Sequence, residues 1–435
     1  MINIWYRINT MAEKQFFDYK ELVDGIIVPA HLLAFYDVSF SEFLKKSKLP
    51  FIIDPMTYLW SMDVSYVTKD DELKKSYKKY VEKLNCNIGN ILGYINIYLF
   101  NYVESDLHNF ISKVLSFQET LGEFEEAPRS KSILRIKKYQ KKSVDIKIKP
   151  NSYVPPYFYF SNVIGTPYRL NNEIMKYTIK LDRYEYNDIT PCLCMDKEVI
   201  SDDDSRNRII EDFSNFNQVI IWINDFDERL TNIAELSYFK DLINSFKDNG
   251  VHVINLYGCY FSVLLNYFGL DTFSSGINIS HRKSIDSIPT GGGQPIRYYE
   301  PNIKMEIINE IAYRLYMRHP ELFLCECPIC REYFLKIKDI TSNKENVLSD
   351  LFIDLKDSKG KIIRKAKMDW KNSRLHFLYC RKKEIIEQNN LPSNEIIKKL
   401  KDDYEYLSST LDFRFYNFTS VEYLKHWYEI ISERS

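Results

Sequence analysis

The segment QVIIWI, residues 218–223, is apolar after its first residue and shows no alternation of polar and apolar positions. A strand of this kind is buried on both faces, which is typical of a parallel sheet. Four other segments have the same character: Ile26–Ala30 (IIVPA), Pro50–Ile53 (PFII), Tyr157–Phe160 (YFYF) and Val251–Leu256 (VHVINL). The sequence therefore predicts that these five segments are strands of a parallel sheet.

Amphipathic stretches lie between the predicted strands and are predicted to be helices. They are Asp71–Leu84, Ile233–Lys247 and Cys259–Phe268, the last followed by Gly269, a typical helix stop. Alternation of strands and helices predicts an α/β fold, and a length of 435 residues suits a TIM-like (β/α)₈ barrel with insertions. We expect this barrel over residues 1–302.

From about Ile303 the chain becomes charged and helical, with amphipathic segments around Glu395–Leu407 and Val421–Ile431. We expect a separate helical C-terminal subdomain over residues 303–435, which would also carry the metal site described below.

The composition is that of a globular protein: 45% of the residues are hydrophobic, 15% are aromatic and only 13 are glycine, which excludes a disordered or fibrous chain. The 59 basic and 60 acidic residues nearly cancel, so net charge does not indicate a nucleic-acid binder. From the first 20 residues we expect no signal peptide, and from the lack of an apolar run of about 20 residues we expect no membrane helix. Eight cysteines, three of them within six residues, favour a reduced compartment and a metal site. We expect a soluble, cytoplasmic protein whose oligomeric state stays open.

One stretch departs from the even distribution of charge. Arg129–Lys149 holds nine basic residues and one acid, Asp145. A solvated surface is one interpretation, and an insertion that contacts a nucleic-acid backbone is the other. The candidate contact residues are Lys137, Lys138, Lys141 and Lys142.

Cys325, Cys327 and Cys330 place three thiolates within six residues. Zn²⁺ takes four soft or borderline ligands in a tetrahedron, so a fourth ligand must come from elsewhere in the chain. His376 lies in a predicted helix downstream, and Cys380 follows it one turn later. We favour His376 as the fourth ligand, with Cys380 as the alternative, in a closed structural zinc site.

This cysteine knuckle, with a distant helical histidine behind an α/β region, resembles the tRNA-guanine transglycosylase superfamily. Those enzymes are zinc-bearing TIM barrels that exchange a base of nucleic acid at its N-glycosidic bond. Residues Pro50–Tyr58 (PFIIDPMTY) resemble the family strand that ends in Thr-Asp-Ser-Gly-Gly-Tyr/Phe, whose Asp is a catalytic carboxylate. Val251–Ile279 resembles a later strand, a Gly turn, a helix and a Gly-Ile/Val-Asp-x-Phe-Asp strand. Thr290–Tyr299 (TGGGQPIRYY) resembles the DNA-modifying branch, which inserts 7-deazaguanine bases into DNA.

The chain departs from the family pattern at the positions that carry the chemistry. Ser274 occupies the position of the family's covalent nucleophile, an Asp. Pro55–Thr57 replaces the Ser-Gly-Gly that follows the first carboxylate, and Ser161 stands where the family has the Asp that binds guanine. The resemblance therefore implies a base other than guanine, and a modified base fits the altered pocket better.

The resemblance implies that Asp54 is a catalytic carboxylate, and its position directly after a buried strand places it at the carboxyl end of a barrel. Cleavage of an N-glycosidic bond builds positive charge on the sugar, which a carboxylate stabilises, and the carboxylate can accept a proton from attacking water. The alternative role of Asp54 is to cap the turn that Pro55 shapes. With Ser274 as a poor nucleophile, water becomes the acceptor and base exchange becomes hydrolysis; a shifted register would instead make Asp271 the second carboxylate.

An enzyme that acts on a base in a duplex flips it out of the stack and holds it between aromatic or apolar walls. Aromatic candidates are Tyr58, Trp60, Tyr157, Tyr159 and Phe160, and core packing is the alternative for each. Polar candidates for the base pocket are Ser161, Asn162, Asn224 and Asp225. Candidates for phosphate contact are Arg282, Lys283 and Arg297, near the glycine run 291–293, which is also typical of a plain flexible loop.

Three functional hypotheses follow. The first is a DNA glycosylase that leaves an abasic site, similar in outline to antiphage DNA glycosylases that remove glucosylated hydroxymethylcytosine. The second is a DNA base-exchange enzyme that uses Asp54 and Asp271. The third is a non-catalytic nucleic-acid-binding subunit. In each, the partner is nucleic acid, with double-stranded DNA that carries modified bases as the leading candidate.

Overall fold

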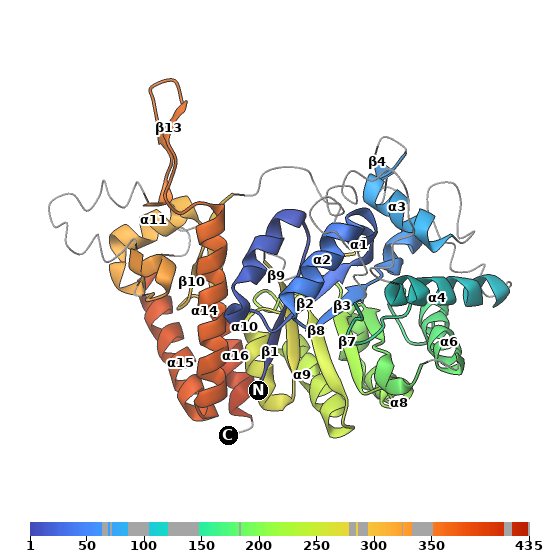
Figure 1. Ribbon diagram of the computed structural model, residues 1–435. Helices are drawn as coiled ribbons and strands as arrows, with labels where there is room; N and C mark the ends of the chain where they lie inside the picture. Colours follow the sequence, from blue (N-terminus) through green and yellow to red (C-terminus); the bar gives the residue numbers. More distant parts are fainter. Residues whose placement is uncertain are drawn as a thin grey trace. The chain divides into compact units, whose positions relative to one another are not determined.

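Seven parallel strands form the main sheet of the protein and give it an α/β fold in which the sheet curls as a half-barrel (Figure 1). Their order across the sheet is β3-β2-β1-β9-β8-β7-β6. The strands are β1 (Asn3–Arg7), β2 (Gly25–Pro29), β3 (Phe51–Asp54), β6 (Cys192–Met195), β7 (Gln218–Ile223), β8 (His252–Leu256) and β9 (Thr272–Gly276).

The computed structural model describes residues 1–62, 68–69, 72–85, 104–120, 148–181, 184–277, 284–285, 295–323, 325–332, 351–412 and 420–433. Two compact units divide the chain, one made mostly of Met1–Asp227 and Ala234–Gly276, the other mostly of Thr290–Ser435 with Glu228–Ile233. The expected boundary at residues 302 and 303 falls inside the second unit because a hairpin, β10 (Arg297–Glu300) with β11 (Met305–Ile308), spans it.

The predicted strands are buried on both faces, which accounts for their continuous apolar sequences. Residues Val219–Ile223 of β7 are all buried, as are residues Val253–Leu256 of β8, and neither strand alternates. A parallel sheet covered on both faces requires this pattern. Four of the five predicted strands are confirmed as β2, β3, β7 and β8, within one residue at each end.

The fifth predicted strand, Tyr157–Phe160, is wrong as a regular strand. Only Phe160 forms a bridge, pairing with Met195 of β6. Pro155 and Pro156 precede the segment and have no N–H to donate to a ladder. The next amides find side chains instead, because Tyr157 N donates to Thr57 Oγ1 (2.8 Å) and Phe158 N donates to Asn171 Oδ1 (2.9 Å).

The same irregular segment hydrogen-bonds to both edge strands of the sheet. At its start, Asn151 N donates to Phe51 O in β3 (2.9 Å). At its end, Phe160 N donates to Cys194 O in β6 (3.0 Å), and Asp196 N donates back to Phe160 O (3.0 Å). Residues 151–160 thus connect the two edges that the seven-stranded order leaves open.

Helices of the first unit accompany the strands in alternation along the chain. They are α1 (Ala30–Phe35), α2 (Asp37–Ser47), α3 (Lys75–Leu84), α4 (Glu104–Glu119), α6 (Thr166–Lys180), α7 (Lys197–Ser201), α8 (Asp203–Phe213), α9 (Ile233–Asp248) and α10 (Tyr260–Leu264). In α9 the buried residues Leu236, Phe239, Leu242, Ile243 and Phe246 recur at helical spacing, as predicted for this segment. The predicted helix over 259–268 is α10 continued by a 3₁₀ turn, and Gly269 ends it with a φ of 106°.

The second unit is mainly helical, as expected. Besides the β10–β11 hairpin and a smaller hairpin of β12 (Leu355–Lys356) with β13 (Ile362–Arg364), it contains α11 (Asn309–Arg318), α14 (Trp370–Asn390), α15 (Ser393–Thr410) and α16 (Glu422–Ser432). The last two confirm the predicted amphipathic segments near residues 395–407 and 421–431. Among the described residues, no helix combines the length and apolar character that crossing a membrane requires.

Candidate active site and candidate metal centre

The carboxyl ends of β1 and β3 bring two opposite charges together. Asp54 is the last residue of β3 and Arg7 the last residue of β1, with β2 between them. Arg7 NH1 lies 2.5 Å from Asp54 Oδ2, and the two side chains are only 2% and 7% exposed. The expected carboxylate at this edge of the sheet is therefore half of a buried ion pair.

Two further donors complete the surroundings of Asp54. Tyr157 donates its hydroxyl to Asp54 Oδ1 (2.8 Å), and Met56 N donates to the same oxygen (2.9 Å). The contact from an N–H two residues further on is an Asx turn, and Met56 itself adopts a left-handed φ of 50°. Asp54 therefore does cap the turn after β3, and this role coexists with the ion pair.

These contacts keep Asp54 ionised. Burial alone would raise its pKa, but the Arg7 charge and the hydrogen bonds from Tyr157 and Met56 outweigh burial and lower the pKa below 3.8. A carboxylate with a low pKa is a weak proton acceptor but a permanent negative charge. At neutral pH it can stabilise positive charge more readily than it can deprotonate water.

Aromatic rings surround the ion pair. Tyr58 stacks on Tyr157, with ring centroids 5.8 Å apart, and meets Trp222 of β7 edge-on at 4.7 Å. Tyr257, directly after β8, contacts Trp222 at 5.5 Å and lies 5.7 Å from the Arg7 guanidinium. Burial raises the pKa of Tyr58 and of Tyr157 well above 10, so both phenols stay protonated, and that of Tyr157 donates to Asp54.

Sequence reasoning identified Asp54, Tyr58 and Tyr157 but missed three members of this cluster: Arg7, Trp222 and Tyr257. A signal for Arg7 exists, since it is the charged end of the apolar run Ile4–Tyr6 (IWY) in β1. That run was not identified as a strand. The ion pair could not be read from the sequence because its two residues are 47 positions apart.

Ser274 lies in the middle of β9 and is fully buried. The register pairs it with Trp5 of β1 and with Leu256 of β8, two residues before Gly276 pairs with Arg7. Ser274 therefore shares the sheet face of Arg7. Among the described residues its hydroxyl has no hydrogen-bond partner, and no basic side chain activates it as a nucleophile.

Asp271 lies at the amino ends of the strands, whereas Asp54 lies at their carboxyl ends. It immediately precedes β9, its carbonyl accepts a hydrogen bond from Asn3 N at the start of β1 (2.9 Å), and its carboxylate lies 3.1 Å from Nδ1 of His252 at the start of β8. Because all these strands are parallel, the start of β9 lies at the amino end of the sheet and the end of β3 lies at its carboxyl end. The structure does not bring Asp54 and Asp271 together, so the alternative of a paired catalytic role for Asp271 is corrected.

The predicted base-pocket residues fall at two places. Phe160 is buried against Tyr168, with ring centroids 5.0 Å apart, whereas Ser161 and Asn162 are exposed. Asn224 and Asp225 follow β7 at the same edge of the sheet as Asp54. The Asn224 amide oxygen is occupied, since it accepts the N–H of Ile285 (2.8 Å).

The other aromatic candidates do not join the cluster around Asp54. Trp60 packs on Tyr80, with ring centroids 5.1 Å apart, and the hydroxyl of Tyr159 donates to Asp196. Trp60 and Tyr159 therefore have packing roles, the alternative to a role in the base pocket.

Most of the predicted backbone contacts lie outside the described residues: Lys137, Lys138, Lys141, Lys142, Arg282 and Lys283. Arg297 is described, at the start of β10 in the second unit, where its carbonyl accepts a hydrogen bond from Ser373. Its role in phosphate contact stays a prediction.

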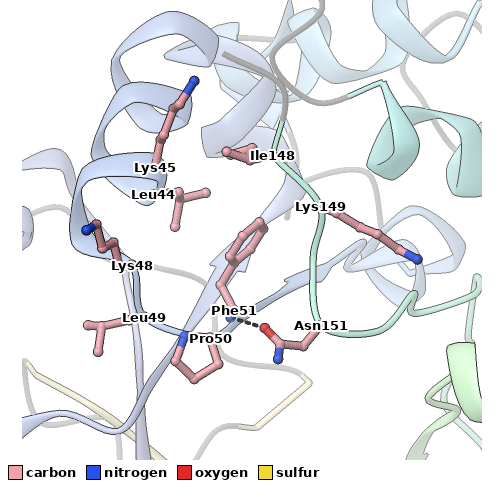
Figure 2. Close-up of a pocket in the computed structure, with 9 residues that line it drawn as sticks. All are labelled: Leu44, Lys45, Lys48, Leu49, Pro50, Phe51, Ile148, Lys149 and Asn151. Atoms are coloured by element: carbon pink, nitrogen blue, oxygen red, sulfur yellow. Dashed lines mark hydrogen bonds between the residues drawn. The ribbon is translucent and has the colours of Figure 1, made fainter.

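A hollow lies at the other end of β3 from Asp54 (Figure 2). Its floor includes Phe51, the first residue of β3, whose N–H donates to Asn151 Oδ1 (2.9 Å). Three lysines line it: Lys45 and Lys48 from the end of α2, and Lys149 from the end of the basic stretch 129–149. Their side chains point in different directions (Figure 2), and the Lys149 ammonium lies 4.0 Å from Asp188 and 5.6 Å from the centre of the Tyr153 ring.

The second unit contains a cluster of metal-ligand side chains. One ligand atom from each of Cys325, Cys327, Cys330 and His376 lies within 4.8 Å of every other, so the group could hold a metal ion. His376 Nδ1 lies 3.3 Å from the sulfurs of Cys327 and Cys330 and 3.9 Å from that of Cys325. The four residues favoured as ligands are thus brought together, and Cys380, the alternative ligand, lies beside them with its sulfur 3.6 Å from His376 Nδ1.

The histidine is oriented by contacts behind it. Its Nε2 lies 2.7 Å from the carbonyl oxygen of Tyr299 in β10, so an Nε2–H donates there and leaves Nδ1 free to face the sulfurs. The ring of Tyr298 stacks on the imidazole at 4.2 Å. This arrangement is typical of a metal-bound histidine held in one tautomer.

The donor set fits a soft or borderline divalent cation. Three thiolates and one imidazole match the tetrahedral zinc sites of proteins.

No protein-family model matches the chain, and no curated protein matches it significantly. The candidate site therefore stands on its own geometry.

Proposed function

We propose that the protein is an N-glycosyl hydrolase that acts on nucleic acid, with Asp54 as the carboxylate that stabilises the sugar cation. The observation that carries this proposal is the buried, ionised Asp54 at the carboxyl edge of a curled parallel sheet, within a cluster of aromatic rings. Active sites of (β/α) barrels are located at this edge.

The contacts of Asp54 define what it does in this reaction. A carboxylate offers about four lone-pair sites. Arg7, Tyr157 and Met56 use three of them, which leaves one direction for a ligand. Because its pKa is lowered, Asp54 stabilises the oxocarbenium-like transition state by charge, and Arg7 and Tyr157 hold it in position.

The resemblance to the tRNA-guanine transglycosylase superfamily supports the proposal from the sequence side. In this interpretation residues 151–160 take the place of the eighth strand and close the sheet into a TIM-like barrel, because they hydrogen-bond to both β3 and β6. The Cys₃His cluster is a structural zinc site, closed by four protein ligands with no position for a water.

Hydrolysis is proposed rather than base exchange for two reasons. Ser274 is a weak nucleophile, and Asp271 lies at the opposite edge of the sheet. We propose DNA with a modified base as the substrate, since the position that reads guanine in the family is Ser161. Removal of a base that marks viral DNA would place the protein in antiphage defence.

A second candidate is a non-catalytic nucleic-acid-binding subunit, and one observation favours it. Asp54 is only 5% exposed and already binds three donors, as a purely structural ion pair would. In that case the hollow with Lys45, Lys48 and Lys149 would be the functional surface.

The test is to incubate the purified protein with duplexes that carry cytosine, hydroxymethylcytosine or glucosylated hydroxymethylcytosine. Free base, measured by mass spectrometry, together with alkali-labile strand breaks is expected for at least one modified duplex. Asp54→Asn should reduce this release by roughly a hundredfold or more, as loss of a transition-state charge contact does.

Asp271→Asn is the matched control, because it changes an Asp at the other edge of the sheet and should leave base release unchanged. Tyr157→Phe keeps the ion pair and the aromatic ring but removes the hydroxyl that donates to Asp54. If this variant folds normally but releases less base, Tyr157 positions Asp54 for the reaction and is not needed for stability. Incorporation of a supplied labelled base would support exchange instead, and binding without base release would support the non-catalytic subunit.

A further inference from the structure

The metal centre contains one donor more than a tetrahedral ion takes. Cys380 Sγ lies 3.5 Å from Cys325 Sγ and 3.6 Å from His376 Nδ1, yet it is not one of the four mutually close ligand atoms. Zinc in a structural site binds four ligands. A fifth potential donor, the fourth sulfur of the cluster, therefore lies beside the ligand set and contacts the sulfur of Cys325.

The two sulfurs differ in access and in backbone setting. Cys380 is 3% exposed and lies in α14 one turn after His376, so the helix holds both residues on one face. Cys325 is half-buried and lies outside any helix or strand. Solvent can therefore reach Cys325, whereas Cys380 is buried within a helix.

We propose that Cys325 and Cys380 form a reversible disulfide under oxidation by a peroxide, and that its formation releases zinc from the metal centre. The inference rests on the proposed zinc at this centre and not on the proposed glycosylase activity. It assigns Cys380 the role of resolving cysteine.

The oxidation balances in two steps. The Cys325 thiolate attacks hydrogen peroxide, which gives a sulfenic acid at Cys325 and hydroxide. The Cys380 thiol then attacks that sulfur, the S–S bond forms, and the sulfenic oxygen leaves as water with the thiol proton. One peroxide is reduced by the two electrons that the two cysteines lose.

The geometry makes this pair favourable. The two sulfurs need to approach by about 1.5 Å to reach the bonded distance of about 2.05 Å. Once Cys325 is bonded to Cys380, only Cys327, Cys330 and His376 remain of the ligand set. A three-ligand site holds zinc less tightly than a closed four-ligand site.

The test treats the zinc-loaded full-length protein with increasing hydrogen peroxide and measures zinc release with a colorimetric chelator alongside peptide mass mapping. We expect a peptide pair linked through Cys325 and Cys380, 2 Da lighter than the two free peptides, to appear together with the released zinc. Added thiol and zinc should restore the loaded protein.

Cys380→Ser decides the assignment. The unoxidised variant should bind as much zinc as wild type, whereas peroxide should drive its Cys325 to sulfinic acid, 32 Da heavier, and thiol should no longer restore zinc binding. Cys259→Ser, which changes a buried cysteine of the first unit, is the matched control and should behave as wild type. Loss of zinc from unoxidised Cys380→Ser would overturn the proposal by making Cys380 a ligand. A wild-type disulfide between any other pair would overturn it as well.

Discussion

Arg7 and Asp54 form a buried ion pair across the carboxyl ends of two strands that are separated by a third, with 2.5 Å between Arg7 NH1 and Asp54 Oδ2. Each partner has a further contact, since Arg7 NH2 also lies 3.0 Å from the sulfur of Met56 and Asp54 accepts the Met56 N–H. The pair thus ties β1 to the turn after β3.

Removal of one partner should destabilise the fold strongly. Arg7→Met or Asp54→Asn leaves a buried charge without its counter-ion, and such losses cost about 3–5 kcal/mol of unfolding free energy. The double variant should cost less than the sum of the two single variants, because neither charge is then left alone. Chemical denaturation of the four proteins measures the coupling.

The exposed pair Lys83–Asp37 provides the matched control. Its atoms are 2.8 Å apart, but the side chains are 31% and 36% exposed, so Lys83→Met should cost about 1 kcal/mol or less. Equal losses at the two pairs, or additive losses at Arg7 and Asp54, would contradict the description of a coupled buried pair.

The pH dependence of stability should carry the signature of Asp54. Its folded-state pKa is lowered below 3.8, so the ionised form stabilises the fold at all pH values above the unfolded pKa. That contribution is lost as the pH falls from about 3.8 through the folded pKa. Stability measured between pH 5 and pH 2 should decline more steeply for wild type than for Asp54→Asn. Parallel curves would show that another carboxylate dominates acid unfolding.

Much of the sheet could be predicted because its strands are short, apolar and buried on both faces, as in β7. The strands that escaped prediction have weaker local signals. β1 ends in an arginine, and β6 (CLCM) contains no β-branched or aromatic residue. Residues 157–160 carry a strong apolar signal, yet prolines upstream prevent a regular ladder. The hydrophobic pattern of a segment predicts that it is buried, but it does not predict which backbone groups pair with it.

The candidate site could be predicted to the extent that it depends on local order. Asp54 directly follows a predicted strand, which places it at the carboxyl end of the sheet, and three cysteines within six residues predict a metal site. The choice between His376 and Cys380 could not be made from spacing, because one helical turn brings both to the same cluster. The Arg7 contact and the position of Asp271 depend on strand order, which no local pattern encodes.

Loss of the histidine should empty the metal centre. We expect His376→Ala to lower zinc affinity by more than the 10- to 100-fold that loss of an outer partner costs, because it removes a ligand itself. Atomic absorption after dialysis measures the bound zinc, and thermal unfolding reports the accompanying loss of stability. His319→Ala, in the same unit beside Glu321, should retain zinc. Full zinc occupancy in His376→Ala would mean that another side chain completes the site.

The lysines at the hollow should contribute to nucleic-acid affinity through phosphate contacts. Each lysine that neutralises a phosphate adds about 0.9 to the slope of log affinity against log salt concentration on duplex DNA. Lys45→Gln with Lys48→Gln should therefore lower affinity at low salt and reduce the slope by up to about 2. Lys176→Gln with Lys180→Gln, at the end of α6, removes the same charge elsewhere and should change neither quantity much. Equal effects of the two double variants would show that binding follows net charge, and the hollow would then have no special part in it.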